Sequence, residues 1–424
     1  MTDDSFPRLQ ARTARFTLGR PRGFVVSPDG SRVLFLRSRG GTDRVTCLWS
    51  YDVATGIESV VADPRALLAA DRDPATDSDP AADLPASEKA RRERAREQAG
   101  GIVGFSTDAR VGLAAFTLAG RLFVTALDAA ESGAAVRELA VGGPVFDPQL
   151  DPTGRTVAYA SDGALRVVSI GGSDRPDDRE LIAEAGVSWG VAEFVAAEEM
   201  SRQRGFWWAP DGASLLAARV DESGVQEWHI GDPSHPERAP MSIRYPAAGT
   251  ANAVVSLSVV HLDGRRVDVS WDHEAFPYVV NVRWRRWSAP LVQLATRDQR
   301  TMRIVEIDVA TGSTTLLRED TDAPWLEVIP GVPDRLPDGR LVCTVDADDT
   351  RRLVVGDQVV TPPGLQVRAI LALSPGDVLF SASTDPTEQH LWGYFSGGEC
   401  VQLTSEPGVH SGNGASDVLV VSSA

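Results

Sequence analysis

The stretch FVVSPDGSRVLFLRS, from Phe24 to Ser38, joins two short apolar strands through the turn Ser-Pro-Asp-Gly. Proline at the second position of a turn presets φ, and glycine accepts the positive φ that a tight turn requires. Related units are QLDPTGRTVAYAS (Gln149–Ser161), FWWAPDGASLLAARV (Phe206–Val220) and RLPDGRLVCTV (Arg335–Val345), with weaker copies FSTDARVGLAAFTL (Phe105–Leu118) and ILALSPGDVLFSAS (Ile370–Ser383). The repeat predicts a series of antiparallel hairpins.

A second pair of strands follows several of these units. Examples are RVTCLWSYDVATG, GRLFVTALDAAESG, GALRVVSIGG, MRIVEIDVATGSTTLL and QHLWGYFSGGECVQLT. Four short strands that recur with one turn type are typical of a β-propeller, in which each blade is a four-stranded antiparallel sheet. We therefore predict an all-β protein with about seven or eight four-stranded blades. An array of β-sandwiches is the alternative, but sandwiches do not repeat this turn at every blade length.

Two segments interrupt the repeat. The charged insertion Pro64–Glu97 begins rich in Ala, Asp and Pro and ends in SEKARRERARE, where Ser87 can cap a short helix. The second segment, Phe194–Arg204, also favours a helix. We expect an N-terminal segment over residues 1–23 and the propeller over residues 24–424, with these helical excursions carrying an Arg run and a Glu pair.

Composition narrows the possible functions. The chain has 424 residues, a formal net charge of −17 and a pI near 4.8, which disfavours nucleic-acid binding because that leans on clustered Lys and Arg. Three dispersed cysteines, Cys47, Cys343 and Cys400, predict free thiols and no zinc site. No secretory signal or membrane-spanning run is recognisable, so we expect a cytoplasmic protein without metal, cofactor or membrane attachment.

The segment Gly186–Gly190 reads Gly-Val-Ser-Trp-Gly, which formally matches the G-x-S-x-G nucleophile motif of hydrolases. That motif works between a buried parallel strand and a helix, inside an alternating β/α fold. No such alternation surrounds Ser188. We therefore predict that Ser188 is a turn residue and that the chain contains no catalytic residue of this type.

The adjacent carboxylates Glu198 and Glu199 follow ten and eleven residues after Ser188. Such a pair on a helix is commonly a solvated face. Here it lies between Phe194-Val-Ala-Ala and Phe206-Trp-Trp, so we expect an apolar setting in which the two charges repel and lose hydration. A primary ammonium has three donors and can satisfy both carboxylates.

The Arg run comprises Arg91, Arg92, Arg94 and Arg96 on the expected helix of the insertion. Paired with neighbouring glutamates, these side chains would form a solvated helix face. Alternatively, one guanidinium could grip a carbonyl or carboxylate in a bidentate manner.

Taken together, several blocks resemble the N-terminal β-propeller of the dipeptidyl peptidase IV family of serine peptidases, within the prolyl oligopeptidase superfamily. The blocks are Trp189–Met200 with its double Glu, Gly205–Gly212, Arg219–Ser223, Arg244–Gly249 and Pro386–Trp392. The resemblance extends from about Phe24 to the C-terminus, and the double-Glu block is its most specific part.

The resemblance implies a function. Family members remove Xaa-Pro or Xaa-Ala dipeptides from free peptide N-termini, and their two glutamates, carried over to Glu198 and Glu199, bind the substrate's α-ammonium. The family also places an Arg near the dipeptide carbonyl. Arg92 is our first choice for this role and Arg96 our second. The implied partners are peptide N-termini, the family's α/β-hydrolase domain and a second copy in a full-length homodimer.

One departure from the family is clear in the sequence. The hydrolase domain that carries the Ser-Asp-His triad in the family is not recognisable here, so we expect a gating and N-terminus-recognising propeller that is inactive alone. A stand-alone propeller that binds a protein or peptide partner is the alternative. A propeller glycosidase is a third possibility, but adjacent glutamates on one helix are too local to straddle a sugar.

Overall fold

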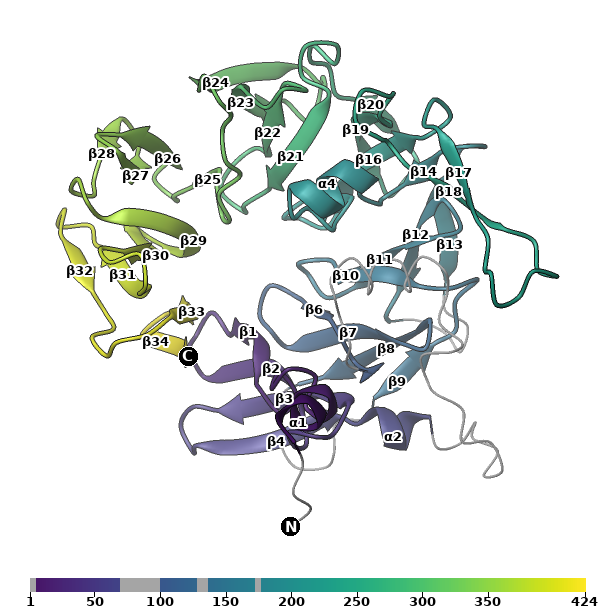
Figure 1. Ribbon diagram of the computed structural model, residues 1–424, viewed down its shortest axis with the longest axis horizontal. Coiled ribbons are helices and arrows are strands. Elements are labelled where there is room, and N and C mark those ends of the chain that lie inside the picture. The colour runs from purple at the N-terminus through teal and green to yellow at the C-terminus, as the bar shows by residue number, and fades with distance from the viewer. Residues whose placement is uncertain (1–4, 69–99, 128–135, 172–176) are drawn as a thin grey trace. The chain divides into compact units, whose positions relative to one another are not determined.

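Four-stranded antiparallel sheets dominate the computed structural model, which describes residues 5–68, 100–127, 136–171 and 177–424 (Figure 1). Within these residues there are seven sheets of four or five strands and two separate two-stranded hairpins. In most sheets the strands follow one another in chain order, as expected for propeller blades.

The first three sheets have simple meander order. They consist of β1 (Arg22–Val26), β2 (Arg32–Ser38), β3 (Val45–Asp52) and β4 (Ile57–Ala62), with β5 (Gly100–Gly101) parallel to β3; β6 (Phe105–Thr107), β7 (Leu113–Leu118), β8 (Arg121–Ala126) and β9 (Arg137–Leu139); and β10 (Phe146–Leu150), β11 (Thr156–Ser161), β12 (Ala164–Ser169) and β13 (Asp178–Ile182).

The fourth and fifth sheets contain the strands nearest to the candidate site. They consist of β14 (Ser188–Trp189), β16 (Ser214–Asp221), β19 (Val254–His261) and β20 (Arg266–Asp268), with β15 (Phe206–Trp208) also on β16; and β21 (Tyr278–Arg283), β22 (Leu291–Ala295), β23 (Thr301–Ile307) and β24 (Thr314–Thr321).

The remaining strands complete two more sheets and the two hairpins. They are β25 (Asp334–Arg335), β26 (Leu341–Ala347), β27 (Thr350–Val355) and β28 (Gln358–Val359); β29 (Gln366–Ser374), β30 (Asp377–Ser383), β31 (His390–Tyr394) and β32 (Cys400–Gln402); and the hairpins β17 (Glu227–Ile230) with β18 (Met241–Arg244) and β33 (His410–Ala415) with β34 (Val418–Ser423). Three short helices are described: α1 (Phe6–Arg12), α2 (Pro64–Leu67) and α4 (Phe194–Glu199).

The repeated turn closes the first hairpin of its sheet, as the sequence predicts. Between β1 and β2, Gly30 has φ 74° and its N–H donates to the Ser27 carbonyl at 2.8 Å. Asp29 accepts a hydrogen bond from the Ser27 hydroxyl at 2.6 Å and from the Ser31 N–H at 3.0 Å. These bonds lower the pKa of Asp29 from 3.8 to about 2, the Ser27 bond first. The turn between β10 and β11 repeats the pattern, since Gly154 N–H donates to Asp151 O at 3.0 Å.

The chain forms two compact units, of which the first comprises residues 1–158, 168–178 and 329–424. One of its cores gathers Leu34, Leu48 and Phe116, and another gathers Val342 and Phe380. The first strand and the last hairpin meet in this unit, because the Asn413 side-chain amide donates to the Phe24 carbonyl at 2.8 Å.

The second unit comprises residues 159–167 and 179–328. Its main core lies between the fourth and fifth sheets and includes Leu216, Leu257 and Val292. Strands β16 and β19 pair over eight residues, from Ser214 opposite His261 to Asp221 opposite Val254. This long ladder fixes β16, and β14 and β15 pair with the opposite edge of the same strand.

Candidate functional site

The first strand of the fourth sheet is interrupted, and the interruption carries helix α4. Trp189 pairs with Arg219 of β16, and Phe206 pairs with Ala217 of the same strand. β14 and β15 therefore pair with successive parts of the same edge of β16, as one interrupted strand would. The chain between them loops out, forms α4 and returns to the same edge.

The base of this excursion is a narrow neck. Val191 and Arg204 form an antiparallel bridge where the chain leaves and returns. The Gly205 carbonyl accepts a hydrogen bond from Ala218 N–H at 2.7 Å, which ties the returning chain to β16. A Cβ at Gly205 would lie 2.2 Å from the Val191 nitrogen. Only glycine allows the two backbones to approach so closely.

Helix α4 packs one face against β21 and leaves the other in solvent. Ala196 and Ala197 are buried, and Met200 joins a cluster with Tyr278, Val280 and neighbouring side chains of the fifth sheet. Alanine is a good helix former, and the apolar face of α4 lies against the sheet. The expected helix over Phe194–Arg204 is confirmed in its first half, since α4 ends at Glu199.

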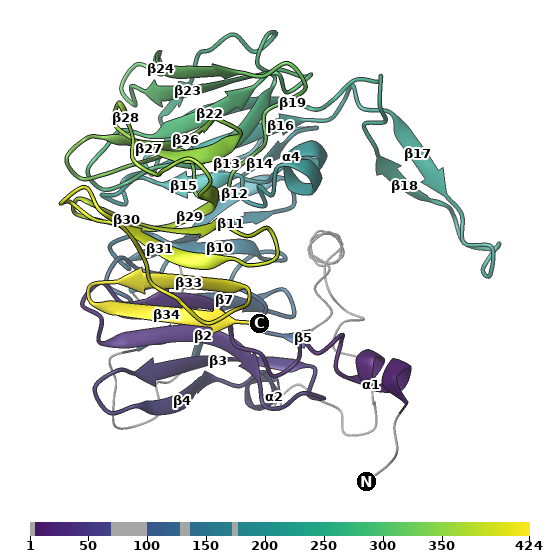
Figure 2. The same ribbon diagram turned by 60° about the vertical axis from the view of Figure 1, so that its left-hand side comes forward.

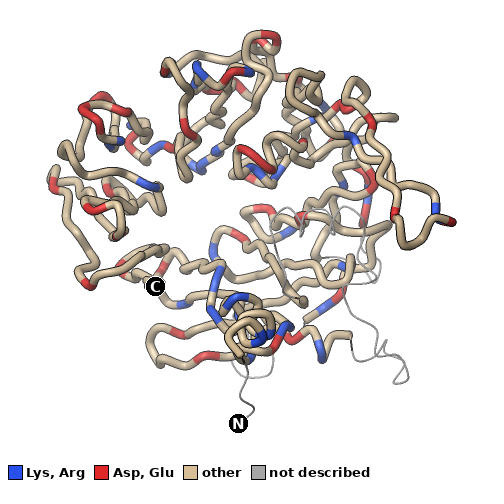
Figure 3. The backbone as a smooth tube through the Cα atoms, viewed as in Figure 1, with Lys and Arg blue, Asp and Glu red and all other residues tan. Residues whose placement is uncertain are grey.

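Glu198 and Glu199 lie in the last turn of α4, and both are exposed. The expected dehydrated setting is therefore wrong: Ala196, Ala197 and Met200 take the buried positions, so the carboxylates remain in water. Acidic residues are unfavourable at this end of a helix, because the carbonyl groups there already carry partial negative charge. Figure 3 shows acidic residues on α4 and basic residues on the segment beside it. Two exposed carboxylates at the negative end of α4 can attract a cation.

A buried ion pair, which sequence reasoning missed, joins the residue before α4 to a residue after it. Glu193 caps the N-terminal end of α4 without a side-chain cap bond, and its Oε2 lies 2.6 Å from Nη2 of Arg202. Each of the two side chains is 4% exposed. Opposite charges nine residues apart gave no signal in the sequence, because neither a helical nor a strand period brings them together.

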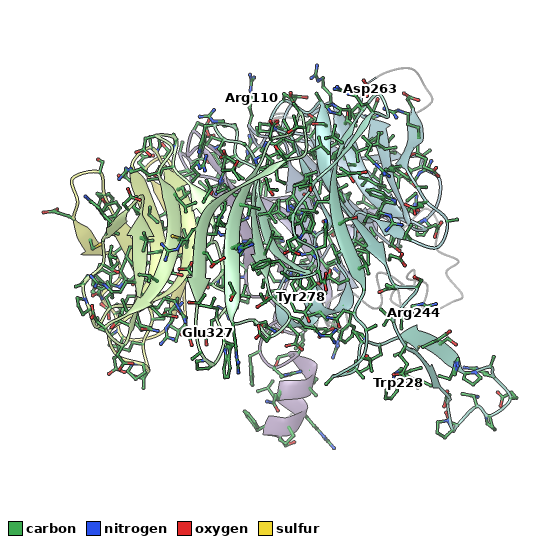
Figure 4. The ribbon with its side chains drawn as sticks, turned by 90° about the horizontal axis from the view of Figure 1, so that it is seen from above. Arg110, Trp228, Arg244, Asp263, Tyr278 and Glu327 are labelled. Carbon is green, nitrogen blue, oxygen red and sulfur yellow. The ribbon has the colours of Figure 1, made fainter. Side chains whose placement is uncertain are left out.

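An aromatic contact joins α4 to the hairpin β17–β18. The rings of Phe194 and Tyr245 lie edge to face at 5.1 Å, and those of Tyr245 and Trp228 at 5.6 Å. The hairpin extends away from the sheets of its own unit (Figure 2). Figure 4 shows Trp228 and Arg244 on this hairpin and Tyr278 apart from them. Nη1 of Arg244 holds the base of the hairpin by donating to the Val225 carbonyl at 2.9 Å.

An ion pair joins Arg219 of β16 to Glu184 of the loop after β13. Nε of Arg219 donates to Glu184 at 2.7 Å, and this hydrogen bond lowers the pKa of Glu184 below its usual value. The same bond is the largest cause that raises the pKa of Arg219. Arg219 is thus used to attach the loop after β13 to β16, next to Trp189.

Ser188 is not the turn residue that the sequence predicts. It lies on strand β14 opposite Val220, and the positive φ belongs to Gly186 and Gly190 instead. The strand pairs antiparallel with β16, and the next helix begins only at Phe194. The G-x-S-x-G match therefore has neither the parallel strand nor the immediate helix of a nucleophile elbow.

The Arg candidates cannot be placed beside the Glu pair. Arg92 and Arg96, with the rest of the Arg run, lie outside the residues that the structure describes. Of the charged insertion 64–97, the structure describes the short helix α2, which Asp63 caps through a hydrogen bond from Arg65 N–H.

Neither a metal cluster nor a membrane-spanning helix is found among the residues that the structure describes. Within them, no group of three or more His, Cys, Asp or Glu side chains has the arrangement of a metal site. In the same part of the chain, no helix is both long enough and apolar enough to cross a bilayer.

Comparisons with known proteins identify the fold and the family. Over 98% of this chain the structure resembles the crystal structure of Porphyromonas gingivalis dipeptidyl peptidase 4, with a TM-score of 0.72 and 17% identity, and it covers 57% of that chain. The chain is therefore a β-propeller protein, and the sheets described above are its blades. The model of the dipeptidyl peptidase IV N-terminal region matches residues 117–418. The chain belongs to this family.

Curated relatives agree with this assignment. The chain is 26% identical over 332 residues to a probable dipeptidyl-aminopeptidase B of Grosmannia clavigera, a match that covers 64% of this chain and 34% of the relative. It is 36% identical over 95 residues to human dipeptidyl peptidase 8, covering 19% of this chain and 11% of the relative. The matched region thus spans about a third or less of the length of these relatives.

Proposed function

We propose that this chain is the substrate-gating, N-terminus-recognising propeller domain of a serine exopeptidase that releases Xaa-Pro or Xaa-Ala dipeptides. In this proposal Glu198 and Glu199 bind the α-ammonium of the substrate. The nucleophile, the general base and the oxyanion hole come from the family's α/β-hydrolase domain. Membership of the family supports the reaction class.

The observation that carries the proposal is the pair of exposed carboxylates at the C-terminal end of α4. An ammonium group can donate to both carboxylates, and the negative end of the helix adds to the attraction. The helix lies in an excursion whose neck is closed by the Val191–Arg204 bridge. A cation held there therefore has a defined position relative to β16.

A fixed ammonium site selects for peptides whose free N-terminus lies at a set distance along the bound chain. A peptide with a free N-terminus brings an ammonium group to the carboxylates, whereas an internal segment or an N-acetylated peptide brings none. Hydrogen bonds to charged groups contribute about 1.5–3 kcal/mol each, so a free amine should bind about ten- to a hundredfold more tightly than its acetylated counterpart.

The test is a peptide titration of the chain by NMR, with a short Xaa-Pro peptide that has either a free or an acetylated N-terminus. Glu198→Gln and Glu199→Gln should each remove most of the preference for the free amine. Glu274→Gln, which changes another exposed glutamate of the same unit, is the matched control. Equal affinity of the wild-type chain for both peptides would refute the proposal.

A kinetic test addresses the peptidase assignment itself. In a protein that joins this chain to the family's hydrolase domain, Glu198→Gln with Glu199→Gln should lower kcat/KM for dipeptide release at least a hundredfold. Peptidase activity of residues 1–424 alone, at the level of that joined protein, would contradict the division of roles.

The second candidate is a propeller that binds a protein partner without catalysis. The observation in its favour is the hairpin β17–β18, which exposes Trp228, Ile230 and Met241. Substitution of these three residues by serine distinguishes the two candidates. The substitutions should abolish partner binding if the second candidate is right, and should leave the preference for free N-termini unchanged if the first is right.

A further inference from the structure

The ion pair between Glu193 and Arg202 brackets the helix that carries the glutamate pair. Glu193 precedes α4 directly, and Arg202 follows three residues after its last residue. Their side chains meet at 2.6 Å, and both are almost completely buried. The pair therefore links the entrance and the exit of α4 through side chains, in addition to the backbone bridge at the neck.

Arg202 makes further contacts that reach beyond the pair. Its Nε donates to the Val279 carbonyl of β21 at 2.9 Å, and its Nη1 donates to the Arg204 carbonyl at 2.9 Å. Its own backbone N–H donates to the Ala196 carbonyl inside α4 at 3.0 Å. One guanidinium thus connects the helix, the returning chain and the neighbouring sheet. Lysine could not make all of these contacts, because its single ammonium group lacks the several donors that the planar guanidinium directs to different acceptors.

Stability alone does not explain the pair. Moving two charges out of water is costly, and apolar side chains of similar volume often replace a buried ion pair with no loss of stability. The pair is also imperfectly satisfied, since among the described residues Oε1 of Glu193 is buried without a hydrogen-bond partner. Unlike an apolar contact, the pair makes several hydrogen bonds whose geometry is directional. These bonds favour one placement of α4 over β21.

We propose that Glu193 and Arg202 are positioning residues, which hold α4 so that Glu198 and Glu199 receive a peptide N-terminus at one fixed distance from β21. This inference rests on the proposed function. Arg202 and Glu193 act through the two exposed glutamates and do not touch the ammonium themselves. A displacement of about 1 Å at a site of this kind reduces performance by up to a hundredfold.

The packing of α4 explains why apolar contacts alone do not fix it. The fully buried apolar side chains of α4 and its C-cap are Ala196, Ala197 and Met200, of which two are small, and Val195 is partly buried against the same cluster. A helix that contacts a sheet mainly through small side chains can shift along the sheet, because few of its side chains interdigitate with those of the strands. The flexible Met200 side chain adapts to such shifts. The directional bonds of Arg202 therefore set the register of the helix.

The experiment compares a double apolar variant, Glu193→Leu with Arg202→Met, and the single variant Arg202→Lys with the wild-type chain. The matched control is Glu319→Leu with Arg303→Met, which removes a 2.6 Å ion pair between β23 and β24 of the same unit. Two quantities are measured for each chain: the thermal unfolding midpoint, and the ratio of affinities for free and N-acetylated Xaa-Pro peptide.

The positioning role predicts that the double apolar variant remains folded, with a midpoint within a few degrees of wild type, while its affinity ratio falls at least tenfold. Arg202→Lys should recover part of the ratio, because it keeps a donor opposite Glu193. The control variant should keep the full ratio. A folded apolar variant with an unchanged ratio overturns the inference while leaving the proposed function intact.

The remaining outcomes are also decisive. A wild-type ratio close to one overturns the proposed function and this inference together. If the double apolar variant does not fold, the pair is structural, and the inference survives only if folded Arg202→Lys shows a ratio at least threefold below wild type. An Arg202→Lys chain with the wild-type ratio would then overturn it.

Discussion

Gly205 allows a direct test of the interrupted strand, because alanine at this position must push two backbone segments apart. The new Cβ would lie 2.2 Å from the Val191 nitrogen and 2.4 Å from the Gly190 carbonyl carbon, where ordinary contact is 3.4–4 Å. The neck must open by about 1 Å, which strains the Gly205–Ala218 hydrogen bond. Overpacking against backbone costs about 1–3 kcal/mol or more. We expect Gly205→Ala to lower the free energy of unfolding by about 3 kcal/mol.

The assay for this prediction is urea unfolding monitored by tryptophan fluorescence, with Gly224→Ala as the matched control. A Cβ at Gly224 meets nothing within 4 Å, and its φ is not in the left-handed region. That substitution should be neutral or should stabilise the chain by up to about 1 kcal/mol, since it restricts the unfolded state. If Gly205→Ala and Gly224→Ala unfold at the same urea concentration, the described neck is wrong.

Three further predictions concern other parts of the chain. Asp29→Ala should destabilise the first turn at pH 7. Because the folded pKa of Asp29 is lowered to about 2, this difference from wild type should shrink as the pH falls from 5 to 2.5; a difference in unfolding free energy that does not change with pH would contradict the turn geometry. Burial raises the pKa of the Cys47 thiol to about 11, so at pH 8 a maleimide should label it only after unfolding, which mass spectrometry can check; native labelling as fast as that of a free peptide thiol would be the contrary result. Tyr245→Ala should speed amide exchange across residues 227–244, because it removes two ring contacts that each contribute about 0.5–1.5 kcal/mol, whereas Tyr245→Phe should not; equal exchange in both variants would show that these rings do not hold the hairpin.

The blades could be predicted from sequence because their information is local. In the first hairpin, Pro28 and Gly30 specify the turn, and the short apolar strands on either side specify the pairing. Seven sheets of four or five strands in the described residues agree with the prediction of about seven or eight blades. The interrupted strand escaped prediction, because β14 and β15 are brought together only through their common partner, β16.

The candidate site was only partly predictable, for similar reasons. The double glutamate and its helix are contiguous in sequence, so both could be identified. Whether Glu198 and Glu199 face solvent depends on how α4 packs on β21. The apolar residues on either side of the pair therefore led to the wrong prediction, that of a dehydrated setting. The Glu193–Arg202 pair depends on the return path of the chain, and no local pattern encodes it.

The central claim is that a charged peptide N-terminus binds between Glu198 and Glu199, and the pH dependence of peptide affinity tests it most directly. The α-amino group of a peptide has a pKa of about 7.7–8.0. Measured by NMR titration, the affinity for a free-amine Xaa-Pro peptide should be constant between pH 6 and 7. Above pH 8 it should fall about tenfold per pH unit as the ammonium loses its proton, until it reaches the affinity of the N-acetylated peptide. The same affinity at pH 7 and pH 9.5 would contradict the account.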